Sequence, residues 1–104
     1  EHSWVGDLRV TLTRFEDLTT LTLIDRPGHP ASTFGCSEPD ILCELVDDSP
    51  FPAENECATD LAALQGSLRP DESLATFRGA DLAGTWQLGV ADLEPISTGR
   101  LVQW

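Results

Sequence analysis

Carboxylates and thiols are the side chains of this sequence that could carry out chemistry. Asp47 and Asp48 are adjacent in a turn-like stretch, and two crowded carboxylates need either a proton or a cation. Hard oxygen ligands of this kind select Ca²⁺. The alternative is a solvated acidic face, because the stretch between Arg26 and Arg69 holds eight Asp or Glu residues and no Lys or Arg.

Three cysteines, Cys36, Cys43 and Cys57, are the second chemical feature. Their spacing matches neither a zinc ribbon nor a redox pair separated by two residues. One disulfide and one remaining thiol is the simplest arrangement for an exported domain. The sequence therefore predicts a protein that works outside the reducing cytosol, secreted or at the cell surface.

Residues that could form a catalytic centre are few. His2 stands beside Ser3, and His29 precedes a proline in a loop-like stretch. No nucleophile elbow, zinc-protease motif, dinucleotide fingerprint or phosphate loop surrounds them. Carboxylate pairs leave glycosidase-like chemistry as a remote alternative. We expect the chain not to be an enzyme by itself.

The charge of the chain excludes whole classes of partner. It has 18 acidic residues against six basic ones, and a net charge of −12. Nucleic acid and anionic membrane surfaces would be repelled, whereas divalent cations would relieve the self-repulsion. No apolar run is long enough to insert in a membrane as a helix. At 104 residues, positions 1–104 are expected to form one domain.

Strands must position these groups. Leu8, Val10 and Leu12 alternate with polar residues, as do Trp86 and Leu88, and this period of two is typical of half-buried strands. Strands are expected over residues 8–12, 19–24, 41–46, 66–68, 85–91 and 100–104. Glycine and proline between them indicate turns, so the pattern favours an all-β sandwich. Residues 60–65 leave open either one turn of helix or an irregular approach to a strand.

Aromatic and aliphatic residues outside the regular strands are expected to anchor the core. Leu74 and Phe77 lie in a stretch that otherwise reads as a surface loop. Trp4, Trp86 and Trp104 each stand beside strand-like alternation, so packing in the core or on a sheet face is the expectation for all three.

Five segments, in order, resemble a known family. They read HSWVGDLRVTL (residues 2–12), LTLIDRPG (21–28), FGCS (34–37), LATF (74–77) and GTWQLGVAD (84–92). Together they look like the P domain of proprotein convertases, above all its bacterial secreted form. The likeness runs on to the end of the chain, at residues 99–104.

This resemblance implies a jelly-roll-like antiparallel β-sandwich without catalytic activity. In the family the domain follows a subtilisin-like or other secreted peptidase domain, helps it to fold, and tunes its calcium and pH behaviour. The partner implied is therefore a peptidase domain of the same protein, or neighbouring protein subunits.

The resemblance also points to site residues. Cys36 and Cys57 match the usual cysteine pair and imply a disulfide, which leaves Cys43 free or paired outside this chain. Calcium is the cofactor implied, because four carboxylates match acidic positions common in the relatives. If strands 8–12 and 85–91 pair antiparallel, the first and last of these carboxylates meet at one end of the sheet. The four are Asp7, Asp47, Asp48 and Asp92.

Family members carry further strand sequence before the position of His2 and after Trp104. The expectation is therefore a domain truncated at both ends, lacking its N-terminal strand or strands and exposing core beside Leu8 and Val10. Omitted sequence or a neighbouring chain would supply the strand. This favours an alternative function, a structural or interaction domain of a cell-surface or fibre-forming protein.

Overall fold

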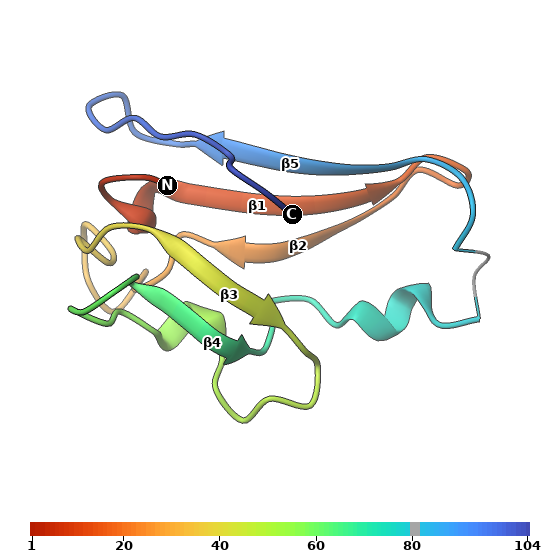
Figure 1. The fold of residues 1–104 in the computed structure, drawn as a ribbon, viewed down its shortest axis with the longest axis horizontal. Helices are drawn as coiled ribbons and strands as arrows, with labels where there is room; N and C mark the ends of the chain where they lie inside the picture. The colour runs from red at the N-terminus through yellow and green to blue at the C-terminus, as the bar shows by residue number, and fades with distance from the viewer. Residues whose placement is uncertain (80–81) are drawn as a thin grey trace.

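The computed structural model describes residues 1–79 and 82–104. Five strands and three short 3-10 helices make up its regular structure, and the described residues contain no α-helix. The predicted all-β fold is confirmed. Nothing in these residues forms a helix long and apolar enough to cross a membrane. The elements in chain order are η1 (Val5–Asp7), β1 (Leu8–Arg14), β2 (Thr19–Asp25), β3 (Ile41–Leu45), η2 (Ala53–Asn55), β4 (Leu64–Leu68), η3 (Leu74–Phe77) and β5 (Trp86–Asp92) (Figure 1).

The central sheet has three antiparallel strands in the order β2-β1-β5. Its central strand, β1, pairs along its whole length with β5, from Leu8 opposite Asp92 to Arg14 opposite Trp86. Residues 15–18 turn the chain from β1 into β2, and Leu18 adopts φ 57°, a conformation usually left to glycine. Because β1 is paired on both sides, β2 and β5 are the outer strands of this sheet.

A bulge in β2 increases the apolar surface that this strand buries. Val10 pairs with Ile24 but Thr11 pairs with Thr22, so Leu23 is an extra residue in the ladder. A bulge breaks the strict alternation of side chains between the two faces. As a result both Leu23 and Ile24 are buried, at 5% and 2% exposure.

The second sheet consists of β3 and β4, and it is parallel. The antiparallel arrangement expected throughout the sandwich is therefore wrong for this pair. Parallel strands need a crossover long enough to return the chain to its starting end. Residues 46–63 provide it, passing through η2 and Cys57 on the way.

The core joins the two sheets into one unit. Leu64 of β4, with no exposed surface, belongs to the same apolar cluster as Leu21 and Val10 of the central sheet. Phe77 of η3 is buried and Leu74 is partly buried against this cluster, as expected of two anchors in a surface stretch. In Figure 1, β3 and β4 lie on the β2 side of the central sheet and β5 on the other.

The end of the chain differs from the expectation. Residues 100–104 form no strand, and the only pairing there is an isolated bridge between His2 and Gly99. Trp104 is 68% exposed, so its expected packing in the core or on a sheet face is wrong. Residues 60–63 form an irregular approach to β4, which begins at Leu64 and not at residue 66.

Candidate functional site

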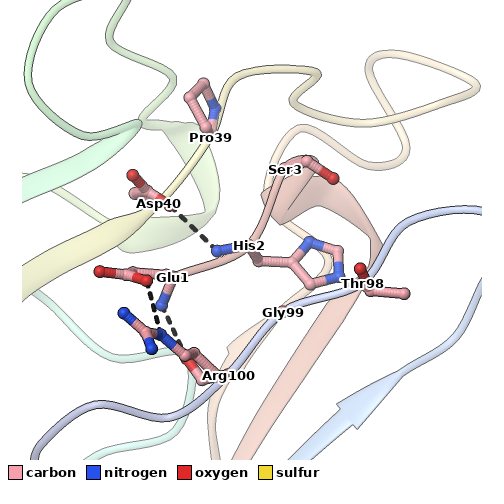
Figure 2. Close-up of a pocket in the computed structure, with 8 residues that line it drawn as sticks. All are labelled: Glu1, His2, Ser3, Pro39, Asp40, Thr98, Gly99 and Arg100. Atoms are coloured by element: carbon pink, nitrogen blue, oxygen red, sulfur yellow. Dashed lines mark hydrogen bonds and ion pairs between the residues drawn. The ribbon is translucent and has the colours of Figure 1, made fainter.

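A shallow pocket of about 450 Å³ lies where the two ends of the described chain meet (Figure 2). The Glu1 backbone nitrogen donates to the Arg100 carbonyl oxygen at 2.8 Å, and the two side chains form an ion pair, also at 2.8 Å. On the other side, the His2 N–H donates to Asp40 Oδ1 at 3.0 Å. The pocket is lined by Glu1, His2, Ser3, Pro39, Asp40, Thr98, Gly99 and Arg100.

His2 is the buried centre of this region, at 6% exposure. Its Nδ1 accepts the Trp4 N–H at 3.1 Å, which places the ring proton on Nε2. Nε2 lies 2.9 Å from Asp92 Oδ2 and donates to it. Neither nitrogen is free to take a proton from the neighbouring Ser3. The ring ties the N-terminal segment to the end of β5.

Asp7 and Asp92 lie at one end of the central sheet, as the antiparallel pairing of β1 and β5 predicts. Asp7 is 7% exposed, and burial, followed by the charges of Asp92 and Glu94, raises its carboxyl pKa. The pKa of Asp92 is lowered, chiefly by the hydrogen bond from His2. The folded structure therefore disfavours ionisation of Asp7 and favours ionisation of Asp92.

Asp47 lies in a different part of the molecule. Its carboxylate accepts the Leu74 N–H at 2.9 Å, the Ala75 N–H at 3.0 Å and the Ser73 hydroxyl at 2.9 Å. These bonds, the one from Leu74 N–H first, lower its carboxyl pKa. Asp47 therefore adds to the cap at the start of η3, whose N-cap residue is Ser73. Its neighbour Asp48 is exposed.

The structure does not bring the four predicted calcium ligands together. η1, which contains Asp7, and η3, which Asp47 caps, lie toward opposite ends of the long axis (Figure 1). Across the described residues, no three or more His, Cys, Asp or Glu side chains are grouped so as to hold a metal ion. The direction of β3 is the physical reason, because it carries Asp47 and Asp48 away from the end where Asp7 lies.

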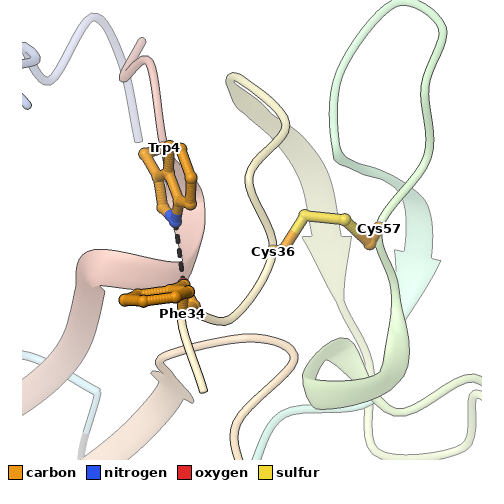
Figure 3. The surroundings of a disulfide bond; sticks show 4 residues. All are labelled: Trp4, Phe34, Cys36 and Cys57. Atoms are coloured by element: carbon orange, nitrogen blue, oxygen red, sulfur yellow. Dashed lines mark hydrogen bonds between the residues drawn. A yellow bond between two sulfur atoms is a disulfide. The ribbon is translucent and has the colours of Figure 1, made fainter. Parts of the chain in front are cut away.

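A disulfide joins Cys36 to Cys57, the pair that the resemblance implies, with 5.6 Å between their Cα atoms (Figure 3). The loop carrying Cys36 is held further by Trp4, whose Nε1 donates to the Phe34 carbonyl oxygen at 2.8 Å. Cys43 is a free, partly buried thiol in β3. Burial raises its pKa, so it behaves as a small apolar residue and a weak nucleophile.

A second pocket, of about 350 Å³, contains an acid that sequence analysis missed. Burial raises the pKa of Glu54 to about 7, with smaller contributions from Asp71 and Asp25. Glu54 Oε1 accepts the Asp25 N–H at 2.7 Å. A carboxyl group half-ionised near neutral pH can exchange a proton there. No local signal distinguishes Glu54 from other acids, because its pKa is set by burial and by residues distant in the sequence.

No family model, curated protein or solved structure matches this chain. The five segments that resemble the P domain do contact one another in the fold. Residues 2–12 and 21–28 contain most of β1 and β2, and residues 84–92 contain all of β5. The Cys36 carbonyl oxygen accepts the Gly6 N–H at 2.9 Å, and the rings of Phe77 and Trp86 pack edge to face at 4.8 Å.

Proposed function

We propose that this chain is a non-catalytic accessory module of an exported peptidase, subtilisin-like or of another secreted type. The observation that carries the proposal is the contact among the five P-domain-like segments, which are dispersed along the sequence. Phe77 of the fourth segment packs on Trp86 of the fifth, and Gly6 of the first donates to Cys36 of the third. These contacts are what a single P-domain-like unit would require.

Two further features support the proposal. The disulfide between Cys36 and Cys57 suits an oxidising compartment, and hence a secreted or cell-surface protein. The hydrogen bonds on both ring nitrogens of His2 suit a structural role for this histidine and a module whose catalytic partner is another domain.

The adjoining coding sequence and its peptidase provide the test. We expect a serine-peptidase triad or a zinc-peptidase motif beside this chain. Secretion of that peptidase without the module should lower the yield of active enzyme by about tenfold or more, because the peptidase domain would lose a folding partner. A third version keeps the module but carries Val5→Asp, which places a charge at a position with no exposed surface and should unfold the module. We expect this version to lower the yield as deletion of the module does. Equal yields of active enzyme from all three versions would contradict the proposal.

Calcium binding is a separate prediction from the resemblance, because the four carboxylates that suggest it do not meet at one site. Calorimetric titration with CaCl₂ tests it on the unmodified chain. The variants Asp7→Asn and Asp47→Asn then report on the two ends of the molecule. Loss of the binding heat in one variant supports a calcium site at that end. The absence of binding heat, with a melting temperature unchanged by chelation, rejects calcium as a cofactor.

A second candidate function is favoured by the open edge of β5. This candidate is an interaction domain of a cell-surface or fibre-forming protein that receives a strand from a neighbouring chain. Repeat-like or pilin-like sequence beside this chain would favour it over the peptidase module.

A further inference from the structure

The two outer edges of the central sheet, on β2 and β5, differ in how their backbone groups are hydrogen-bonded. On β2, the outward backbone groups of Thr22 are both used, since its N–H donates to Glu72 Oε1 at 2.8 Å and its carbonyl oxygen accepts the Glu72 N–H at 2.9 Å. The Leu23 carbonyl oxygen accepts the Asp71 N–H, also at 2.8 Å. The segment after β4 therefore covers this edge at Thr22 and Leu23.

Among residues 1–79 and 82–104, nothing covers the outer edge of β5 in this way. Two hydrogen bonds flank the β1–β5 ladder. The Phe15 N–H donates to the Thr85 carbonyl oxygen, and the Leu93 N–H donates to the Asp7 carbonyl oxygen. In the β5 segment, the residues bonded to β1 are therefore the odd-numbered ones. In an antiparallel pair, bonded and outward-facing residues alternate. The N–H and C=O groups of Trp86, Leu88 and Val90 therefore point away from β1. The described residues supply no partner for them.

Asp92, the last residue, is the one charged side chain of β5, and the rest of the strand lacks the features that protect sheet edges from pairing. Residues 82–91 contain no charged side chain and no proline, and the pairing of β5 with β1 has no bulge. Exposed edges of monomeric proteins usually carry one of these devices. The other strands with an open edge, β3 and β4, are shorter, with five residues each. β3 carries Glu44, and β4 is interrupted by Gly66 at φ 74°.

The apolar face of β5 is incompletely covered. Val90 stands opposite Val10 in the ladder, yet Val90 is 48% exposed and Val10 only 8%. The second sheet lies on the β2 side of the molecule, away from β5 (Figure 1). An additional strand beside β5 would place alternate side chains next to Leu88 and Val90 and extend the core over them.

Charge indicates what kind of strand fits. At the start of β5, Glu16 and Asp17 share one cation, Arg14. At its end, Asp7 feels the charges of Asp92 and Glu94, of which Asp92 pairs with His2 and Glu94 with Arg26. Both ends of the edge are therefore acidic. A second copy paired antiparallel would bring acidic end against acidic end, whereas a strand with basic ends would be attracted at both.

We propose that the outer edge of β5 binds one extended segment of a partner protein, with alternating apolar residues and Lys or Arg at both ends. Backbone hydrogen bonds to Trp86, Leu88 and Val90 hold it, and the acidic ends of the edge fix its position. This inference rests on the second candidate function and specifies its partner. It is independent of the peptidase yield experiment, so either can fail alone.

The test uses the 104-residue chain and a synthetic peptide, acetyl-RKVTVTVRK-amide, of about nine residues so that it can span the strand. Amide hydrogen exchange by NMR follows Leu88 and Val90. We expect both amides to exchange fast in the free chain and about tenfold or more slowly with the peptide bound. A control peptide with Glu and Asp in place of Arg and Lys should give no protection.

A pair of variants keeps the test specific to the edge. Val90→Pro removes an outward N–H without removing a bond to β1, and edge strands tolerate proline at such a position. Val90→Ala shortens the same side chain and keeps the N–H. We expect Val90→Pro to weaken peptide binding about tenfold and Val90→Ala to weaken it less.

Four results would overturn the proposal. The Leu88 and Val90 amides could already be protected in a monomer, which would mean that the chain covers its own edge. Protection together with a dimeric mass would identify a second copy as the occupant. Equal protection of the Leu88 and Val90 amides by the acidic peptide would show that the partner segment does not need basic ends. Unchanged binding by a folded Val90→Pro variant would place the peptide elsewhere. If that variant does not fold, the exchange rates of Leu88 and Val90 in the unmodified chain test the proposal instead.

Discussion

Single carboxyl groups in this acidic chain differ because of where the fold puts them. Burial raises the pKa of Glu54 and of Asp7. Hydrogen bonds lower the pKa of Asp47 and of Asp92. The first two groups favour the folded state when protonated, and the last two when ionised. Stability should therefore respond to pH in opposite directions at these sites.

Glu54→Gln tests the raised group. The pKa of Glu54 is about 7 in the folded state against 4.5 as its ordinary value, so its stabilising proton is present below about pH 4.5 and lost as pH rises through 7. The variant keeps an oxygen for the Asp25 N–H and removes the buried charge. We expect it to raise the free energy of unfolding by about 1 kcal/mol at pH 8, an amount discounted for partial exposure, and to change little at pH 5.

Urea unfolding of Glu54→Gln at the two pH values checks this prediction. Glu44→Gln is the matched control, because Glu44 is exposed and also accepts one hydrogen bond, from the Ser67 hydroxyl. The same change in stability at pH 5 and pH 8 would show that burial does not control the protonation of Glu54.

At the scale of elements, the disulfide loop ties three segments together. The Cys36 N–H donates to the Pro27 carbonyl oxygen at 2.7 Å, and the Cys36 carbonyl oxygen accepts the Gly6 N–H. A Cβ added at Gly6 would lie 2.6 Å from the Cys36 backbone nitrogen, so this contact requires glycine. The crossover between β3 and β4 is anchored through Cys57 to the same place.

Removal of the disulfide should destabilise the chain strongly. For a sequence separation of 21 residues, loop entropy predicts a loss of about 3 kcal/mol in the double variant Cys36→Ser/Cys57→Ser. Chemical unfolding measures it. Cys43→Ser is the control, with a smaller expected loss, because it changes a free, partly buried thiol. Similar losses in the two proteins would mean that the crossover does not depend on the disulfide.

The contact of η3 with β5 should also be a large contributor. Phe77 is 8% exposed and packs on Trp86 edge to face, so Phe77→Ala should lower the free energy of unfolding by about 3 kcal/mol. Tryptophan fluorescence during urea unfolding provides the measurement. Phe34→Ala should change stability little, because Phe34 is 72% exposed. Equal effects would contradict the assignment of Phe77 to the core.

At the scale of the whole molecule, open edges and charge act against each other. An uncovered β5 edge promotes association, and a net charge of −12 resists it. The core is small, so each uncovered apolar side chain takes a notable share of the stability. Aliphatic residues near the end of the chain are exposed as well, Ile96 at 93% and Val102 at 64%.

The chain alone is therefore expected to be marginally stable, to aggregate, or to take up a strand from another chain. Purification of the 104-residue protein, followed by its mass in solution and its thermal unfolding, tests this. A monodisperse monomer with a cooperative transition well above room temperature would show that the sandwich closes without help. Added salt should favour association, because it screens the repulsion between acidic chains.

Strand positions in the central sheet follow from the sequence alone. Alternation of apolar and polar residues is a local property, so it predicts β1, β2 and β5 to within a few residues. The antiparallel neighbours β1 and β5 then place Asp7 and Asp92 at one end. The cysteine pair was available only through the resemblance, because three cysteines allow several pairings.

Other properties depend on tertiary structure. Residues 100–104 have a strand-like pattern, yet they pair with no strand of the described part of the chain and are irregular. The crossover between β3 and β4 makes that sheet parallel and carries Asp47 away from Asp7, which separates the predicted calcium ligands. Burial in the folded chain, and not any local sequence signal, raises the pKa of Glu54 to about 7. Periodicity describes one strand at a time, whereas strand direction, edge exposure and desolvation depend on residues far apart in the chain.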